Sequence, residues 1–117
     1  MEAETSDGPA GARVWERAVR EFAGKARAAL GARLVRLMLY GSRARGDAAA
    51  DSDVDLLAVV DGMAGDDARR ALWRLAVEVE LRRADVFLAV VVMTADEWEA
   101  ERGFSFAGAV RREGVAV

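Results

Sequence analysis

Two aspartates at the start of an apolar segment are spaced so that their carboxylates could act together at one site. Asp53 and Asp55 flank Val54 at the beginning of the segment VDLLAVV. If this segment is a strand, its side chains alternate between two faces, so both carboxylates point the same way with their backbones roughly 6.6 Å apart. Two like charges this close repel one another, and burying them is costly unless a cation is present. The spacing therefore predicts a site for a divalent metal.

The metal expected at this site is Mg²⁺, which prefers carboxylate and phosphate oxygens. The sequence contains neither cysteine nor histidine, so the usual zinc ligands and a disulfide framework are excluded. Two hard cations about 3.5–4 Å apart can hold the attacking and leaving oxygens of a phosphoryl displacement. The acid pair alone is a weak signal, because Asp-x-Asp also occurs at solvated strand ends.

A second group of residues precedes the acids. Gly41 and Ser42 follow the apolar segment LVRLMLY, and a short helix is expected to begin near Ser42. Free N–H groups at a helix start favour an anion, and Gly41 has no side chain to keep a phosphate away from the backbone. Ser42 can cap the helix or donate to a phosphate oxygen. Arg43 and Arg45 can neutralise phosphate charge, and for Arg45 a simply solvated guanidinium explains the sequence equally well.

A third carboxylate would complete such a site, and Asp85 is the candidate. It stands at the start of the apolar segment DVFLAVVVM, which is expected to be a third strand. If this strand lies beside the second, Asp85 faces the same end as Asp53 and Asp55 and can orient an attacking hydroxyl. The alternative interpretation of Asp85 is a cap between the preceding helix and the strand.

The hydrophobic pattern predicts the elements that must position these residues. Helical spacing of apolar residues predicts a helix over residues 13–30, and short apolar segments predict strands over 34–40, 54–60 and from 85 onward. A helix is expected between Asp66 and Arg83, with Asp66 or Asp67 as its N-cap. This alternation of helices and strands predicts an α/β (α+β) fold, with a small mixed sheet flanked by helices.

Two further helical segments are expected towards the end of the chain. Thr94 and Glu97 form the sequence pattern of a capping box, which predicts a helix start at this point. Phe104, Phe106 and Val110 suggest another short helix, followed by a terminal apolar tail.

Length and composition fit a single domain. The chain has 117 residues, and 53% of them are hydrophobic, which is enough for one packed core. We expect a disordered segment over residues 1–12 and one domain over 13–117. The absence of any apolar stretch of roughly 20 residues argues against a membrane protein. The acidic N-terminal segment lacks the features of a signal peptide, which favours a cytoplasmic location. A net charge of −3 gives no reason to expect direct nucleic-acid binding.

Two segments resemble a known family. LYGSRARG at residues 39–46 and SDVDLLAVV at residues 52–60 are similar to the motifs of the minimal nucleotidyltransferase (MNT) family, within the DNA polymerase β-like superfamily. The ending RREGVAV is similar to the usual tail of that family, and the resemblance covers roughly residues 30–117. It implies the polymerase β-like nucleotidyltransferase fold. It also implies metal-dependent transfer of a nucleoside monophosphate, with AMP from ATP expected, to a hydroxyl group.

The resemblance also implies roles for individual residues. Asp53 and Asp55 match the metal-binding pair, Gly41 and Ser42 match the triphosphate contact, and Asp85 is expected to be the third acid that binds metal. Independently of the resemblance, the positive charges of Arg43 and Arg45 beside the Gly-Ser turn lead us to expect that they contact the nucleotide. Two Mg²⁺ ions and ATP are the cofactor and substrate that follow from this assignment.

The same resemblance implies a partner. Small members of the family commonly pair with a HEPN-domain protein in a toxin–antitoxin module, where the nucleotidyltransferase is the antitoxin and adenylylates a tyrosine of the toxin. The chain is therefore expected to form a homo- or hetero-oligomer. Two alternatives stay open. One is a non-catalytic antitoxin that occludes a HEPN ribonuclease, and the other is nucleotidyl transfer to a small molecule.

Overall fold

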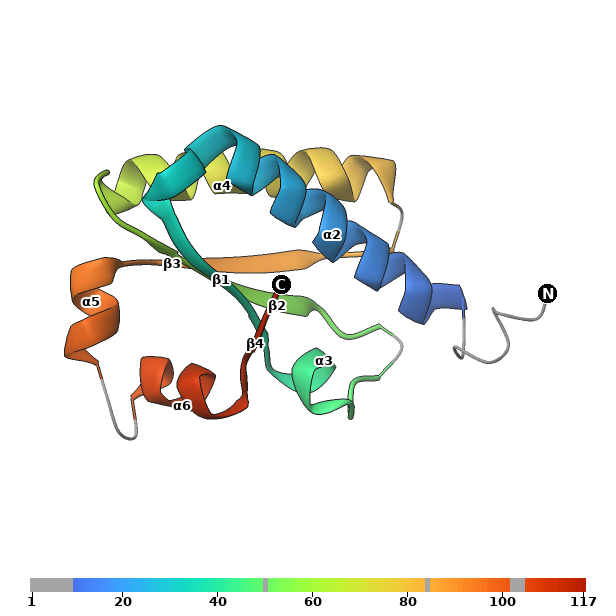
Figure 1. The fold of residues 1–117 in the computed structure, drawn as a ribbon. Helices are drawn as coiled ribbons and strands as arrows, with labels where there is room; N and C mark the ends of the chain where they lie inside the picture. Colours follow the sequence, from blue (N-terminus) through green and yellow to red (C-terminus); the bar gives the residue numbers. More distant parts are fainter. Residues whose placement is uncertain (1–9, 50, 84, 102–104) are drawn as a thin grey trace.

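A computed structural model describes residues 10–49, 51–83, 85–101 and 105–117, which form a four-stranded sheet with helices on both faces (Figure 1). In chain order the elements are α2 (Ala10–Leu30), the 3₁₀ turn η1 (Gly31–Arg33), β1 (Leu34–Tyr40), α3 (Ser42–Arg45), β2 (Val54–Val60), α4 (Gly65–Arg82), β3 (Leu88–Thr94), α5 (Ala95–Ala100), α6 (Phe106–Glu113) and β4 (Val115–Ala116). None of the helices in these ranges has both the length and the hydropathy that a membrane span requires.

The sheet is mixed, as the sequence predicts, and its strand order is β3-β2-β1-β4. β2 pairs in parallel with β3 and antiparallel with β1, and β1 also pairs antiparallel with the short β4. The sequence predicts only an apolar tail where β4 lies. Val115 and Ala116 become a strand because they pair with Leu39 and Met38, residues too distant in the chain for a local pattern to reveal.

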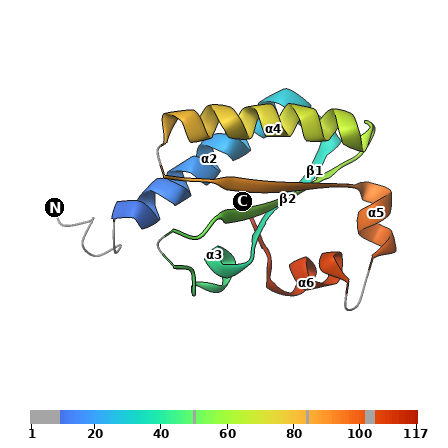
Figure 2. The same cartoon turned by 180° about the vertical axis from the view of Figure 1, so that it is seen from behind.

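The helices divide between the two faces of the sheet. α2 and α4 cover one face, and α3, α5 and α6 lie on the other (Figures 1 and 2). We call these the α2/α4 face and the α5/α6 face. Alternate residues of β2 serve each face: Leu56 belongs to the large cluster under α2 and α4, and Leu57 belongs to a smaller cluster with Trp98 and Val110. Both sides of β2 are therefore committed to packing along most of its length.

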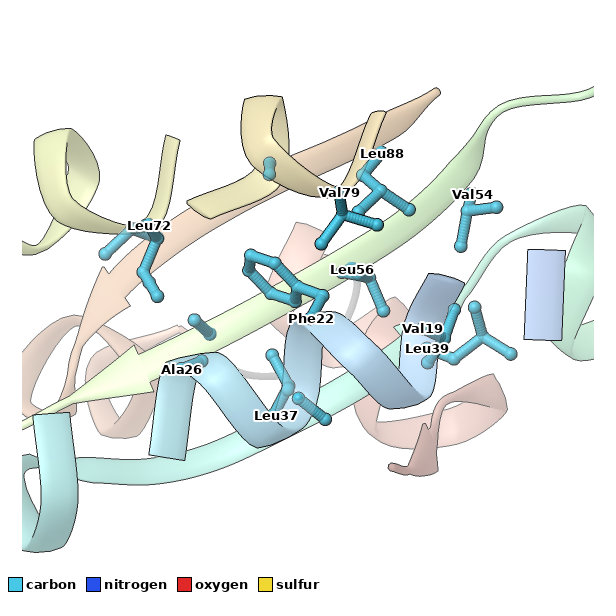
Figure 3. Packing of buried hydrophobic residues seen from close by; sticks show 14 of the residues in the cluster. Val19, Phe22, Ala26, Leu37, Leu39, Val54, Leu56, Leu72, Val79 and Leu88 are labelled. Carbon is cyan, nitrogen blue, oxygen red and sulfur yellow. The ribbon is translucent and has the colours of Figure 1, made fainter. Parts of the chain in front are cut away.

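The α2/α4 face holds the main core (Figure 3). Phe22 of α2, Leu72 of α4 and Leu56 of β2 are fully buried there. The helical spacing of buried residues in α2 explains why it packs along one stripe, since every third or fourth residue returns to the same side of a helix. The valine-rich strands suit a pleated surface because their branched side chains pack well across it.

Several element boundaries differ from those predicted. α2 begins at Ala10, so residues 10–12, assigned by sequence to the N-terminal segment, belong to a helix. Residues 1–9 and Phe104 lie outside the described residues. The N-cap of α4 is Ala64 rather than Asp66 or Asp67, and both aspartates lie in the first turn, where the helix dipole favours a negative charge. The capping box of Thr94 and Glu97 is confirmed, with hydrogen bonds in both directions.

Candidate active site

The paired aspartates lie where β2 begins, on the α5/α6 face of the sheet. Asp53 immediately precedes the strand and is exposed, and Asp55 is its second residue and half-buried. Asp55 pairs with Tyr40 across the antiparallel ladder, and partners in such a ladder project to the same side. The site is therefore bordered by the end of β1 on one side and by the chain entering β2 on the other.

Gly41 contacts the carboxylate of Asp55. A Cβ atom at Gly41 would lie 2.5 Å from Asp55 Oδ2, which is closer than Cβ atoms come to other atoms in real proteins. The backbone of Gly41 has φ +77° and ψ −156°, a conformation that residues with a side chain avoid. Glycine is required here for both reasons. Because Gly41 has no side chain, the turn at Gly41 and Ser42, which the sequence suggests as a phosphate site, can lie against the acid pair.

The helix expected near Ser42 is present as the single turn α3. Gly41 is its N-cap and Ser42 its first residue, with no side-chain hydrogen bond at the cap. The capping role considered for Ser42 is therefore wrong. The carbonyl of Gly41 accepts hydrogen bonds from Ala44 N at 3.1 Å and Arg45 N at 3.0 Å. Ser42 and the start of the turn lie directly after the residue that touches Asp55.

Arg43 connects α3 to the segment that carries the acids. Its Nη2 donates to the carbonyl of Ser52 at 3.1 Å, one residue before Asp53. Its guanidinium also lies over the ring of Trp15, with 5.3 Å between the guanidinium carbon and the ring centroid. Trp15 lines a groove of about 560 Å³ along α2, on the α2/α4 face. Arg43 therefore helps to position the loop before Asp53, in addition to any contact with a nucleotide.

Arg45 is engaged by two carboxylates. Its Nε donates to Asp47 at 3.2 Å and its Nη1 donates to Glu113 at 2.9 Å, which joins α3 to α6. These hydrogen bonds, with that to Asp47 contributing most, raise the pKa of the Arg45 guanidinium above its ordinary value. No local pattern marks Glu113 as a neighbour of this site, because it lies 68 positions from Arg45.

The electrostatics of the pair fit a cation. Burial is the main cause that raises the pKa of Asp55 above its ordinary value of 3.8, the negative charge of Asp53 raises it further, and Arg45 partly opposes both. Burial, and then the charge of Asp55, raise the pKa of Tyr40 above 10.0. Asp55 is therefore partly desolvated beside a second carboxylate, and the hard oxygen donors of Asp53 and Asp55 fit a divalent ion such as Mg²⁺.

Asp85 does not join this pair. The third strand begins at Leu88 rather than at Asp85, which lies in an exposed turn with φ +69°. The predicted strand start is wrong because positive φ takes Asp85 out of the extended conformation, and Asp is one of the few residues that tolerates it. In the described parts of the chain, no three acidic side chains gather closely enough to hold a metal ion.

Apolar side chains share the α5/α6 face with the acids. The ring of Phe106 at the start of α6 meets the ring of Tyr40 edge-on, with centroids 5.3 Å apart. Phe106 is 41% exposed and Val91 of β3 is 38% exposed. Val91 is in register with Leu57, so it projects to the same face as Asp55. No local sequence pattern marks Tyr40 or Val91 as part of the site. Alternation along β1 and β3 shows which residues of each strand share a face. Only the pairing register between strands shows that Tyr40 and Val91 lie on the same face as Asp55.

Comparisons with known proteins identify the family and the fold of the chain. The sequence profile of the family described as "Nucleotidyltransferase domain" matches residues 19–105. A search of curated protein sequences gave no match. The fold is similar to the crystal structure of a proposed nucleotidyltransferase from Sulfolobus solfataricus, with a TM-score of 0.62, 21% identity, and coverage of 91% of this chain and 81% of that one.

A second similar structure is that of a toxin–antitoxin complex with AMP-PNP. The TM-score is 0.53 and the identity 18%, over 81% of this chain and 68% of that one. At such identities these two likenesses establish the fold, whereas the profile match spans most of the chain and includes α3, the acid pair and β3.

Proposed function

The chain belongs to the nucleotidyltransferase domain family, and from this premise we propose that it transfers a nucleoside monophosphate, AMP from ATP, to a hydroxyl group of a protein partner. The observation that carries the proposal is the contact between Gly41 and Asp55, which places the turn of α3 against the acid pair. A triphosphate beside that turn would lie next to the two carboxylates that suit a divalent cation.

Each residue of the site has a distinct role in this proposal. Asp53 and Asp55 would hold Mg²⁺, which when bound neutralises phosphate charge and polarises the phosphoryl group. Gly41 leaves the backbone open to a phosphate, and the Ser42 hydroxyl can donate to a phosphate oxygen. Arg43 holds the segment before Asp53 through the Ser52 carbonyl. The charge of Arg45 lies close enough to affect Asp55, and it favours an anionic ligand.

The apolar surface beside the acids supports a protein as the acceptor. Val91 and Phe106 expose apolar area on the α5/α6 face, and Phe87, directly before β3, is 57% exposed. Such exposed groups favour association with another protein rather than with a small polar substrate. One of the structures with a similar fold is a toxin–antitoxin with AMP-PNP. We therefore propose that the partner is a HEPN-type toxin, that a tyrosine of the toxin accepts the nucleotide, and that this chain is the antitoxin.

One observation favours a second function, in which the chain binds and occludes the toxin without chemistry. The described part of the site offers two carboxylates rather than three, so no carboxylate of β3 stands beside an attacking hydroxyl. Neutralisation by occlusion would need only the apolar surface. Replacing both Asp53 and Asp55 with Asn separates the two functions: catalysis predicts that neutralisation is lost, and occlusion predicts that it survives.

The proposal is tested by incubating the purified protein with Mg²⁺, labelled ATP and the product of the adjacent gene. Intact mass of both chains is then measured. We expect the partner to gain one or more AMP units, and Asp53→Asn to abolish the gain because the cation loses a ligand. The matched control is Asp61→Asn, which removes an exposed carboxylate at the opposite end of β2. A stable complex with unchanged masses would contradict transfer and favour occlusion.

A further inference from the structure

The position on β3 that stands level with Asp55 is Ala89. β2 and β3 are parallel, and their register pairs Val54 with Leu88, Asp55 with Ala89, and Leu57 with Val91. In-register partners of a parallel pair project to the same side, so the methyl group of Ala89 lies on the α5/α6 face beside the Asp55 carboxylate. This is the position from which the third strand would present a carboxylate to the acid pair.

The rest of β3 offers no substitute. The strand Leu88–Thr94 contains no acidic residue, and Asp85 lies three positions before it in an exposed turn. β3 is also the outermost strand on this side of the described sheet, so no further strand there presents a side chain over Ala89. Within the described residues, no third acidic side chain lies close enough to Asp53 and Asp55 to share a metal ion with them.

Two carboxylates are a small ligand set for a free divalent ion. Mg²⁺ requires six oxygen ligands in near-octahedral geometry, and the affinity of an oxygen site rises with the number of charged ligands. Two carboxylates leave most of the coordination positions to water. A triphosphate brings further anionic oxygens, and the turn at Gly41 is placed against Asp55 to receive it.

We propose that Ala89 makes metal binding by this chain depend on the nucleotide: the two-carboxylate site holds a divalent cation weakly alone and firmly only together with a nucleoside triphosphate. The inference rests on the proposed function, since it assumes that Asp53 and Asp55 are the metal ligands. It adds a specific cause for weak binding of the free ion, which is the missing carboxylate at position 89.

The test uses Mn²⁺, which takes the same oxygen ligands as Mg²⁺ and can be counted by its electron paramagnetic resonance signal. The full chain is titrated with Mn²⁺ alone and with a non-hydrolysable ATP analogue present. We expect the analogue to tighten Mn²⁺ binding to the wild type by about tenfold or more, after correction for Mn²⁺ bound to free analogue. Ala89→Asp should bind Mn²⁺ alone about tenfold more tightly than the wild type.

The control for Ala89→Asp is Ala89→Asn, which has the same shape without the charge and should bind Mn²⁺ alone as weakly as the wild type. Thermal unfolding of each variant shows whether it is folded. Equal Mn²⁺ affinities for wild type and a folded Ala89→Asp would overturn the inference. The inference would also be overturned if the wild type bound Mn²⁺ equally well with and without the analogue. This comparison needs only the wild type, so it remains valid even if neither variant folds.

Failure of the inference can be told apart from failure of the proposed function. If Asp53→Asn leaves the Mn²⁺ affinity of Ala89→Asp unchanged, the acids are not the metal ligands and both are overturned. If Mn²⁺ and the analogue bind interdependently while no AMP appears on the partner, the inference stands and the transfer activity fails.

Discussion

The two faces of the sheet share their strands and differ in what those strands present. On the α2/α4 face, β2 contributes Leu56, Ala58 and Val60 to a continuous core that two long helices cover. On the α5/α6 face, the same strand contributes Asp55 at one end and buries Leu57 and Val59 under two short helices at the other. Apolar packing is therefore continuous on one face and limited to part of the other.

This difference indicates that one face supplies most of the folding stability and that the other carries the candidate site. Burial of apolar area is the main favourable contribution to folding, so the α2/α4 face should dominate the free energy of unfolding. The α5/α6 face can then leave charged and apolar side chains accessible, including Asp53, Asp55 and Phe106, without unfolding the domain. Four substitution experiments, in decreasing order of expected effect, test this division.

The largest effect is expected from matched phenylalanine substitutions. Phe22→Ala empties a fully buried position of the α2/α4 face and should lower the free energy of unfolding by about 3–5 kcal/mol. Phe106→Ala removes a ring that is 41% exposed on the α5/α6 face and should cost about 1 kcal/mol. Urea unfolding measures both values. Similar losses for the two variants would contradict the division between the faces.

Glycine substitutions come next. Gly41→Ala forces a side chain into φ +77° and into the Asp55 carboxylate, so it should cost about 1–3 kcal/mol and impair nucleotide binding. Gly24→Ala is the matched control, because Gly24 lies inside α2 with no atom within 4 Å of a new Cβ. It should stabilise the protein by about 0.5–1 kcal/mol. Thermal unfolding and nucleotide titration give the two readouts, and unimpaired binding by Gly41→Ala would argue against the site.

Ion pairs on the two faces allow a finer comparison. Glu113→Gln removes the 2.9 Å contact with Arg45 that joins α3 to α6, and Glu78→Gln removes the 3.2 Å contact with Lys25 that joins α2 to α4. Both pairs are largely exposed, so each change should alter stability by at most about 1 kcal/mol. Only Glu113→Gln is expected to change nucleotide affinity, because Arg45 acts on Asp55. Equal nucleotide affinities for the two variants would place Arg45 outside the site.

The smallest effect is a shift in the titration of Tyr40, the single tyrosine of the chain. Its pKa is raised above 10.0 by burial and by the charge of Asp55. The folded state favours the neutral phenol, so the stability that this preference contributes is present below pH 10 and is lost as the pH rises through the folded-state pKa. Ultraviolet absorbance at increasing pH follows the ionisation directly.

Asp55→Asn should lower the pKa of Tyr40 towards its ordinary value, because it removes the second of the two causes. Asp61→Asn, at the far end of β2, is the control and should leave the titration unchanged. A Tyr40 pKa that is the same in the wild type and in Asp55→Asn would show that the two groups do not interact.

Local patterns were sufficient to predict much of the fold. The mixed sheet, the strands 34–40 and 54–60 and the capping box at Thr94 and Glu97 are present as expected, because alternation, apolar runs and capping chemistry act between residues close in sequence. The predicted start of β3, at Asp85, was wrong by three residues, because the strand begins at Leu88. Apolar residues continue through Val86 and Phe87, and hydrophobicity alone does not reveal the positive φ of Asp85.

The sequence by itself determined which residues are available for chemistry: an Asp-x-Asp pair at a strand start, a Gly-Ser turn before it, and no histidine or cysteine. Only the tertiary structure decided how they meet. The contact between Gly41 and Asp55, the pairing of Arg45 with Glu113 and the register that sets Ala89 beside Asp55 all join segments that are distant along the chain. Strand register and helix docking fix these neighbours, and both depend on how the whole set of apolar faces packs together, which no local pattern specifies.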